Sequence, residues 1–155
     1  MAHLSLAERN HYFAEGWVIP EFQLPQSQVN SLVEALNELI RRFPTSRYSA
    51  DARLKLDLVN DHLAGKEMTI GRSYQRQGKW LAGTVRFRTV IDTYQTTSHA
   101  PEALYRLVES YLSLGIPAEA QKAAAVLGAN YPGNEWYERA YKLMNRHAPE
   151  ALAAK

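Results

Sequence analysis

The five histidines are the first residues to consider for chemistry, and their spacing gives no metal or catalytic site. An iron dioxygenase needs two histidines and a carboxylate, with a His-x-Asp motif supplying two of the ligands, and the sequence has no His-x-Asp. Asp61 and His62 are adjacent, so on a helix they point to different faces. Cysteine, a glycine-rich phosphate loop, a Gly-x-Ser-x-Gly elbow and a His-Glu-x-x-His motif are also absent from the sequence. We therefore expect no cofactor and no metal, and we expect that the chain is not an enzyme.

Arginines are the stronger candidates for binding. Arg72 and Arg76 stand one helical turn apart, and Arg86 and Arg88 follow on the next expected helix. Arginine forms strong two-pronged pairs with carboxylates, so these side chains could receive an acidic partner or a peptide carboxylate. A solvated helix face is the other interpretation, and Arg86 and Arg88, two residues apart, cannot both face the same way. The full set of expected partner-binding residues is Arg72, Arg76, Arg86, Arg88, Arg106, Glu109, Trp136 and Arg139.

The charge is distributed unevenly along the chain, although the formal net charge is only +2. Residues 1–40 carry one basic and five acidic side chains. Residues 41–88 carry eleven basic and four acidic side chains, and residues 89–155 carry six basic and seven acidic ones. A basic middle third can attract nucleic acid, anionic lipid or an acidic protein. A nucleic-acid-binding surface would require exposed aromatic side chains among the basic side chains, and we expect Tyr74 and Phe87 in the core. The sequence therefore favours a protein partner and no nucleic acid.

Length and composition bound the class of protein. The chain has 155 residues, of which 46% are hydrophobic and 22% charged, which is typical of one soluble globular domain. Charges interrupt every apolar run before it reaches the roughly 20 residues that a membrane span needs. The first twenty residues lack the basic start and apolar run of a secretory signal. We expect no membrane span and no leader in this sequence.

Apolar residues recur at helical spacing through most of the chain. Ser27 is the expected cap of the first clear helix, Pro44 ends it, and Gly65 marks a possible bend in the second. Nothing after residue 20 is typical of a strand. The expected helices span residues 27–43, 49–77, 79–94, 100–114, 117–130 and 134–146.

Two glycine turns, at Gly78 and Gly115, punctuate the helices 37 residues apart. Each follows a tyrosine by four residues, Tyr74 in one copy and Tyr111 in the other, as in tetratricopeptide repeats. We expect an all-α tetratricopeptide-repeat solenoid of about six helices with a short helical N-terminal segment. Residues 27–43 would be the second helix of an earlier repeat, and residues 134–146 the C-terminal cap. The expected repeat-packing residues are Gly71, Tyr74, Gly78, Gly83, Phe87, Leu107, Tyr111, Gly115, Ala120, Ala124 and Pro132.

Five motifs stand in order between Leu36 and about Met144. They are Arg42-Phe-Pro-x-Ser-x-Tyr48, Leu63-Ala-x-x-Glu67, Ile70-Gly-Arg-x-Tyr74, Arg86-Phe87-Arg88-x-Val90 and Glu102-Ala-Leu-Tyr-Arg-Leu-Val-Glu109. This set resembles the BamD, or ComL, family of outer-membrane assembly lipoproteins. The resemblance implies a non-catalytic periplasmic scaffold, held by lipid at the outer membrane, which binds the periplasmic domains of a BamA-type partner and unfolded outer-membrane protein segments.

Residues 1–35 lack the leader, lipid-bearing cysteine and complete first repeats that the resemblance implies. A short helix ending in glycine, then Trp17-Val-Ile-Pro20, resembles the opening of phytanoyl-CoA dioxygenase-type proteins. We therefore hypothesise a foreign or atypical segment, residues 1–35, packed on a BamD-like repeat domain, residues 36–155. The alternative function is that of an engineered or recombined chimera with a structural role only.

The family resemblance and the shortened array of repeats lead to two further expectations. The family lies on the periplasmic side of the outer membrane, whereas this chain as made would be cytoplasmic because it lacks a leader and a lipid-bearing cysteine. A truncated solenoid exposes apolar ends, so we also expect a tendency to form a homodimer.

Overall fold

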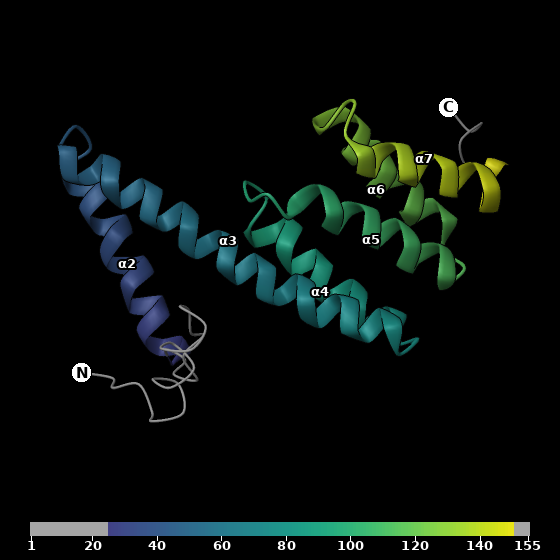
Figure 1. Cartoon of the computed structure of the whole chain (residues 1–155), viewed down its shortest axis with the longest axis horizontal. Coiled ribbons are helices and arrows are strands. Elements are labelled where there is room, and N and C mark those ends of the chain that lie inside the picture. The colour runs from purple at the N-terminus through teal and green to yellow at the C-terminus, as the bar shows by residue number, and fades with distance from the viewer. Residues whose placement is uncertain (1–24, 151–155) are drawn as a thin grey trace, which may run out of the picture. The chain divides into compact units, whose positions relative to one another are not determined.

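A computed structural model describes residues 25–150, in which the secondary structure is helical and contains no strand (Figure 1). The expected all-helical fold is confirmed, with boundaries within two residues of those predicted. The second helix continues past Gly65 without a break. The expected short N-terminal helix lies outside the described residues. Within residues 25–150 the helices are α2 (Gln26–Arg42), α3 (Arg47–Arg76), α4 (Trp80–Thr93), α5 (Ala100–Ser113), α6 (Pro117–Asn130) and α7 (Glu135–His147).

The chain divides into two compact units, residues 1–53 and residues 54–155. The division falls within α3, so the first unit ends in the opening turns of that helix. The boundary that the sequence suggests, between residues 35 and 36, falls inside the continuous helix α2.

The two glycine turns have the same hydrogen bonds. Gly78 and Gly115 both have φ values near +74°, a left-handed conformation that only glycine adopts without strain. After α3, the amide of Lys79 donates to the carbonyl of Tyr74 at 2.9 Å; after α5, Ile116 donates to Tyr111 at the same distance. These are Schellman turns, which satisfy the last carbonyl groups of a helix. The 37-residue repeat in the sequence is therefore also a repeat of backbone structure.

A second shared turn ends the helices α2, α4 and α6. In each, the first residue after the helix donates its amide to the carbonyl four residues earlier, and its own carbonyl accepts from the amide three residues later. The residues that make this turn are Phe43, Tyr94 and Tyr131. By this local structure α2 ends as the second helix of a pair, the position expected for it.

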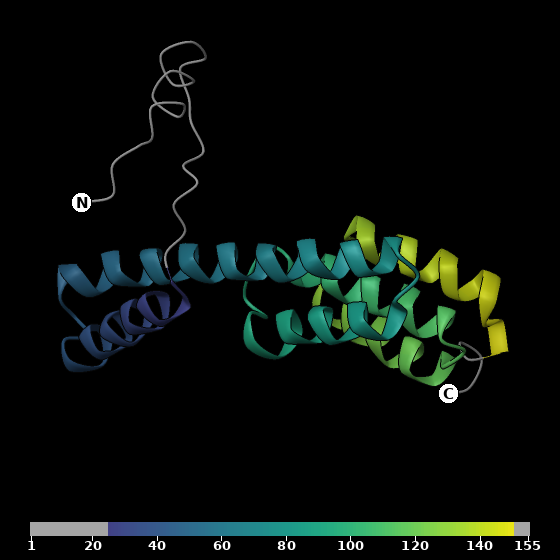
Figure 2. The same ribbon diagram turned by 90° about the horizontal axis from the view of Figure 1, so that it is seen from below.

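The crossing of α3 and α4 in the second unit depends on a glycine. A Cβ atom added at Gly71 would lie 2.5 Å from the ring of Phe87, which is completely buried. At Gly83 it would lie 3.4 Å from the carbonyl oxygen of Gly71. Figure 2 shows α4 lying alongside the second half of α3. Small residues therefore allow the close approach that fills the space around Phe87.

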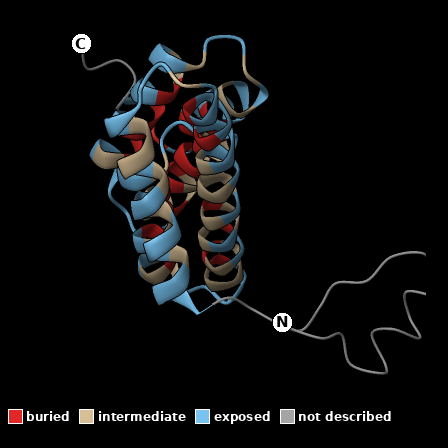
Figure 3. Cartoon of the chain, turned by 90° about the vertical axis from the view of Figure 1, so that its left-hand side faces the viewer, coloured by how far each residue is buried: buried red, intermediate tan, exposed pale blue. Residues whose placement is uncertain are grey.

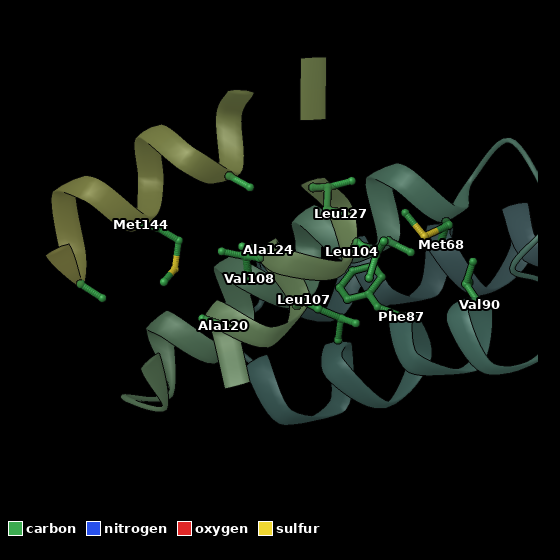
Figure 4. Close-up of a cluster of buried hydrophobic side chains, with 14 of the residues drawn as sticks. Met68, Phe87, Val90, Leu104, Leu107, Val108, Ala120, Ala124, Leu127 and Met144 are labelled. Carbon is green, nitrogen blue, oxygen red and sulfur yellow. The ribbon is translucent and has the colours of Figure 1, made fainter. Parts of the chain in front are cut away.

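The core continues through α5, α6 and α7. Val108, Ala120 and Met144 are fully buried and belong to one cluster of buried apolar side chains, drawn in Figure 4. A Cβ atom at Gly128 would lie 2.6 Å from the ring of Tyr137, so α6 and α7 also meet at a glycine. The sequence analysis did not single out Gly128.

The expected cap of the first helix is wrong, because Pro25 rather than Ser27 occupies the cap position of α2. Helix α2 has a clear apolar stripe, but none of its residues is buried (Figure 3). On α3 the buried residues include Ala64 and Met68, whereas Leu63 and Ile70 are half-buried. An apolar stripe is buried only where another element packs on it, and a closely packed neighbour selects small residues.

Candidate functional site

A groove of about 750 Å³ lies in the second unit and is lined mainly by α3, α5 and α7. Most of its lining comes from equivalent positions of successive helix pairs, each 37 residues apart. The equivalent pairs are Arg72 and Glu109, Gln75 and Leu112, Arg76 and Ser113, Trp80 and Pro117, and Arg106 and Leu143. The remaining lining residues are Gly115 and His147. The repeat that builds the fold therefore also builds the groove.

Both Schellman turns help to form the groove. The turn at Gly78 leads directly into α4, which begins with Trp80, and the turn at Gly115 leads into α6, which begins with Pro117. Proline in the first helical turn loses no hydrogen bond, since the amide there has no partner within the helix. Both residues line the groove, so the repeated turns place apolar side chains along it.

A ladder of ion pairs connects α3 with α5 along the groove. Nη1 of Arg72 lies 3.0 and 2.9 Å from the two carboxylate oxygens of Glu102. Glu102 also accepts from Nε of Arg106 at 3.2 Å, and Nη1 of Arg106 donates to Glu109 at 2.8 Å. Burial works to lower the pKa of Arg106, but its hydrogen bonds and charge pairing with Glu109 and Glu102 outweigh burial and raise it. Both arginines are therefore already paired with carboxylates of the chain.

Aromatic side chains extend this ladder to α7. The hydroxyl of Tyr105 donates to Glu109 at 2.8 Å, and its ring lies 5.3 Å from that of Trp136. The guanidinium of Arg139 lies 4.7 Å above the Trp136 ring, and Arg139 also pairs with Glu135 at 3.1 Å. Burial, followed by the hydrogen bond to Glu109, raises the pKa of Tyr105 to about 12. Tyr105 therefore remains a hydrogen-bond donor at neutral pH.

A buried amide fixes the α3 wall of the groove. The side-chain nitrogen of Gln75 donates to Oγ of Ser110 at 2.9 Å and to the main-chain carbonyl of Arg106 at 3.1 Å. Because both partners belong to α5, this amide holds the register between α3 and α5 where the groove is formed.

Arg76 differs from the other two arginines of the groove. Its side chain is exposed, and within the described part of the chain it makes no hydrogen bond and no ion pair. Its counterpart 37 residues later is Ser113, so the repeat does not supply a second cation at the equivalent place.

The structure brings together some of the expected partner-binding residues and separates others. Arg72, Arg76, Arg106 and Glu109 line the groove, and Trp136 and Arg139 lie beside it through Tyr105. The other two do not line it. Arg86 pairs with Glu67 at 3.1 Å, and Arg88 is exposed elsewhere on α4.

Sequence reasoning missed several residues of this site, notably Glu102, Tyr105 and Gln75. The three- and four-residue spacing of Glu102, Arg106 and Glu109 could have shown a ladder along one helix. No local signal links Arg72 with Glu102, because thirty residues separate them.

The described residues offer neither a metal site nor a membrane-spanning helix. Residues 25–150 contain no cluster of three or more side chains suited to hold a metal ion. No helix in that range combines the length and the apolar character needed to cross a bilayer.

Comparison with known proteins identifies the family. The sequence model of the YfiO family, described as "Outer membrane lipoprotein", matches residues 2–127. The chain belongs to the YfiO family. It is 51% identical to the outer membrane protein assembly factor BamD of Caulobacter vibrioides over 133 residues, which cover 83% of this chain and 44% of that protein. The BamD-like character read from the five motifs is confirmed.

Other relatives of this chain are also named BamD. Identity is 48% to BamD of Rickettsia prowazekii over 130 residues, covering 84% of this chain and 52% of that protein. Identity is 35% to BamD of Neisseria meningitidis over 109 residues, covering 70% of this chain and 41% of that protein. The chain spans about half the length of the curated relatives it matches. Their names describe an assembly factor and not a catalyst, in agreement with the expectation from the motifs.

The YfiO match also bears on the N-terminal segment. It starts at residue 2 and so runs through residues 2–35, for which the sequence analysis weighs a second origin. The foreign or atypical origin of residues 1–35 stays a prediction.

Proposed function

We propose that the chain is a non-catalytic scaffold of outer-membrane protein assembly that binds a polypeptide partner in the groove of its second unit. The proposed partner is the periplasmic part of a BamA-type protein, with unfolded outer-membrane protein segments as further ligands. The proposed place of action is the periplasmic side of the outer membrane.

One observation carries the proposal: the groove is lined at equivalent positions of successive helix pairs. A ligand that follows these positions must extend across three helices, which suits a polypeptide segment better than a compact small molecule. Tryptophan, tyrosine and arginine are enriched where proteins bind one another, and the groove and its edge contain Trp80, Tyr105, Trp136 and several arginines.

The paired charges support a binding role in another way. Side chains that must be ordered on binding cost roughly 0.5–1.5 kcal/mol each in lost freedom. Arg72, Arg106 and Glu109 are already held by hydrogen bonds at 2.8–3.2 Å in the unbound chain. A ligand of this groove therefore meets a wall that is largely organised in advance.

The choice of partner rests on the relatives. Each is named an outer membrane protein assembly factor, so the partner of this chain should belong to the same assembly. Because the chain spans about half of each relative, contacts made by their other halves are not part of the proposal.

Isothermal calorimetry tests this function directly. The full chain is titrated with the periplasmic domains of the BamA-type protein from the same organism. Two groove variants, Leu143→Lys and Ser113→Trp, are compared with Leu81→Lys, whose side chain is 67% exposed on α4 and outside the groove. Ser113 is exposed, so its variant blocks the groove without disturbing the core.

We expect micromolar binding by the unchanged chain and by Leu81→Lys, and at least about tenfold weaker binding by both groove variants, about 1.4 kcal/mol. Absence of binding by the unchanged chain contradicts the choice of partner. Equal binding by all four proteins contradicts the groove as the binding site.

A further inference from the structure

The groove contains one more arginine side chain than the neighbouring carboxylates of the described residues neutralise. Arg72 and Arg106 are paired with Glu102 and Glu109, whereas Arg76 has no acidic or hydrogen-bonding partner among residues 25–150. The excess positive charge of the groove is therefore placed on a single exposed guanidinium.

Three large apolar side chains from other helices line the groove together with Arg76. Trp80 begins the following helix, and Leu112 and Leu143 come from α5 and α7; all three line the same groove. A ligand that reaches Arg76 therefore also meets aromatic and aliphatic surface.

We propose that this groove recognises an extended peptide segment by one acidic side chain, which pairs with Arg76, and by a neighbouring apolar side chain, which packs against Trp80, Leu112 and Leu143. The inference rests on the proposed function and names the chemistry that its groove selects. The planar guanidinium can donate two parallel hydrogen bonds to one carboxylate, which makes arginine a stronger and more selective partner than a point charge.

The other charges in the groove argue against a polyanion. Glu109 lines the groove, so a ligand with many phosphates would meet a carboxylate there, and the two neighbouring arginines, Arg72 and Arg106, are already paired. Like charges placed together across an interface suppress wrong partners. One unpaired guanidinium beside paired carboxylates fits a ligand with a single negative charge at that place.

Fluorescence anisotropy with the full chain tests the proposal. The probe is a fluorescein-labelled peptide, Gly-Ser-Gly-Leu-Glu-Leu-Gly-Ser-Gly, with an amidated C-terminus, and it is compared with the same peptide carrying Gln in place of Glu. A third peptide carries Gln but has a free C-terminal carboxylate, so that a terminal carboxylate and an acidic side chain are distinguished.

The protein variants are Arg76→Gln and, as a matched control, Arg88→Gln. Arg88 is also exposed, and its substitution removes the same charge from outside the groove. Both substitutions lie on the surface, and circular dichroism establishes that each variant remains folded.

We expect the unchanged chain and Arg88→Gln to prefer the Glu peptide over the amidated Gln peptide by about tenfold or more, the value of a charge-assisted hydrogen-bonded pair. In Arg76→Gln the preference should fall to within about twofold. Retention of the preference in Arg76→Gln, its absence in the unchanged chain, or preferred binding of the peptide with the free C-terminus would each overturn the proposal.

The calorimetric experiment keeps the two proposals separate. If the BamA-type domains bind Arg76→Gln as tightly as the unchanged chain while the groove variants fail, the function stands and the role of Arg76 is refuted. If the peptides obey the expected pattern but the BamA-type domains do not bind, the groove recognises acidic peptides and the partner is a different protein.

Discussion

Arg72 and Glu102 join the first helices of two successive repeats through an ion pair in which one guanidinium nitrogen contacts both carboxylate oxygens. The side chain of Glu102 is only 15% exposed and that of Arg72 is 34% exposed. Glu102 also accepts a hydrogen bond from Arg106, so one carboxylate neutralises parts of two cations. Removal of one member of a shielded pair costs more than removal of one member of a surface pair, because it leaves the other charges uncompensated.

Replacement of Glu102 by Gln should destabilise the second unit. Because Arg72 and Arg106 lose their shared anion in a partly buried place, we expect the free energy of unfolding to fall by about 1–2 kcal/mol. Urea denaturation at pH 7 measures the change. Glu119→Gln is the control, since its pair with Lys122 is exposed and should contribute less than about 0.5 kcal/mol. Equal losses in the two variants would show that the ladder has no special role.

The close approach of α3 and α4 predicts a steric cost at Gly71. The Cβ atom of Gly71→Ala would meet the Phe87 ring at 2.5 Å, so we expect a loss of about 1–3 kcal/mol despite the better helix propensity of alanine. Phe87→Leu removes ring atoms from the contact. In the double variant the Gly71→Ala substitution should therefore cost clearly less than it does alone. Additive losses in denaturation experiments would contradict the contact.

Tyr105 should make the stability of the chain depend on alkaline pH. Its pKa is raised to about 12 in the folded chain against 10.0 for an ordinary tyrosine. Above pH 10 the unfolded chain releases this proton first, so the stabilisation is complete below pH 10 and is lost as the pH rises to about 12. Absorbance at 295 nm should show one late-titrating phenol that is missing in Tyr105→Phe. A titration unchanged by this substitution would contradict the buried hydrogen bond.

Asp61 should make the stability of the chain depend on acidic pH, so that stability falls as the pH falls. A hydrogen bond from the Ser98 hydroxyl, together with the Ser98 amide, lowers the pKa of this carboxyl group below 3.8. The stabilisation is therefore present above about pH 4 and disappears as the pH falls through the lowered pKa.

Asp61→Asn keeps an acceptor for Ser98 but removes the charge. The side chain of Asp61 is 42% exposed, so solvent screening should limit the loss at pH 7 to below about 1 kcal/mol. Unfolding experiments at pH 7 and pH 2.5 should show a smaller difference in stability between the two proteins at the lower pH. An equal difference at both pH values would mean that the charge of Asp61 is not its source.

The helices and turns could be predicted because their causes are local. The 3.6-residue spacing of apolar side chains marks each helix, and Gly78 and Gly115 mark turns that require a left-handed residue. The buried side of α3 could not be read in the same way. There the Phe87 ring of α4 requires glycine at position 71, and Ala64 and Met68 are buried while Leu63 and Ile70 are only half-buried.

The binding groove was predictable only in part. Its arginines were recognised as a group, but periodicity does not tell which of them meet an anion within the chain. Arg72 is neutralised by Glu102 and Arg86 by Glu67, each pair joining residues of different helices. Arg76 and Arg72 stand one turn apart and look alike in the sequence, yet only Arg76 is left without a partner in the described range.

Site-specific photo-crosslinking is the most direct test that the groove of the second unit is the partner-binding surface. A benzophenone side chain placed at His147, an exposed residue at the α7 end of the groove, is compared with one at Ala125, an exposed residue of α6 outside it. With the periplasmic domains of the BamA-type protein, we predict a crosslink from position 147 and little or none from position 125. A crosslink from position 125 alone would contradict it.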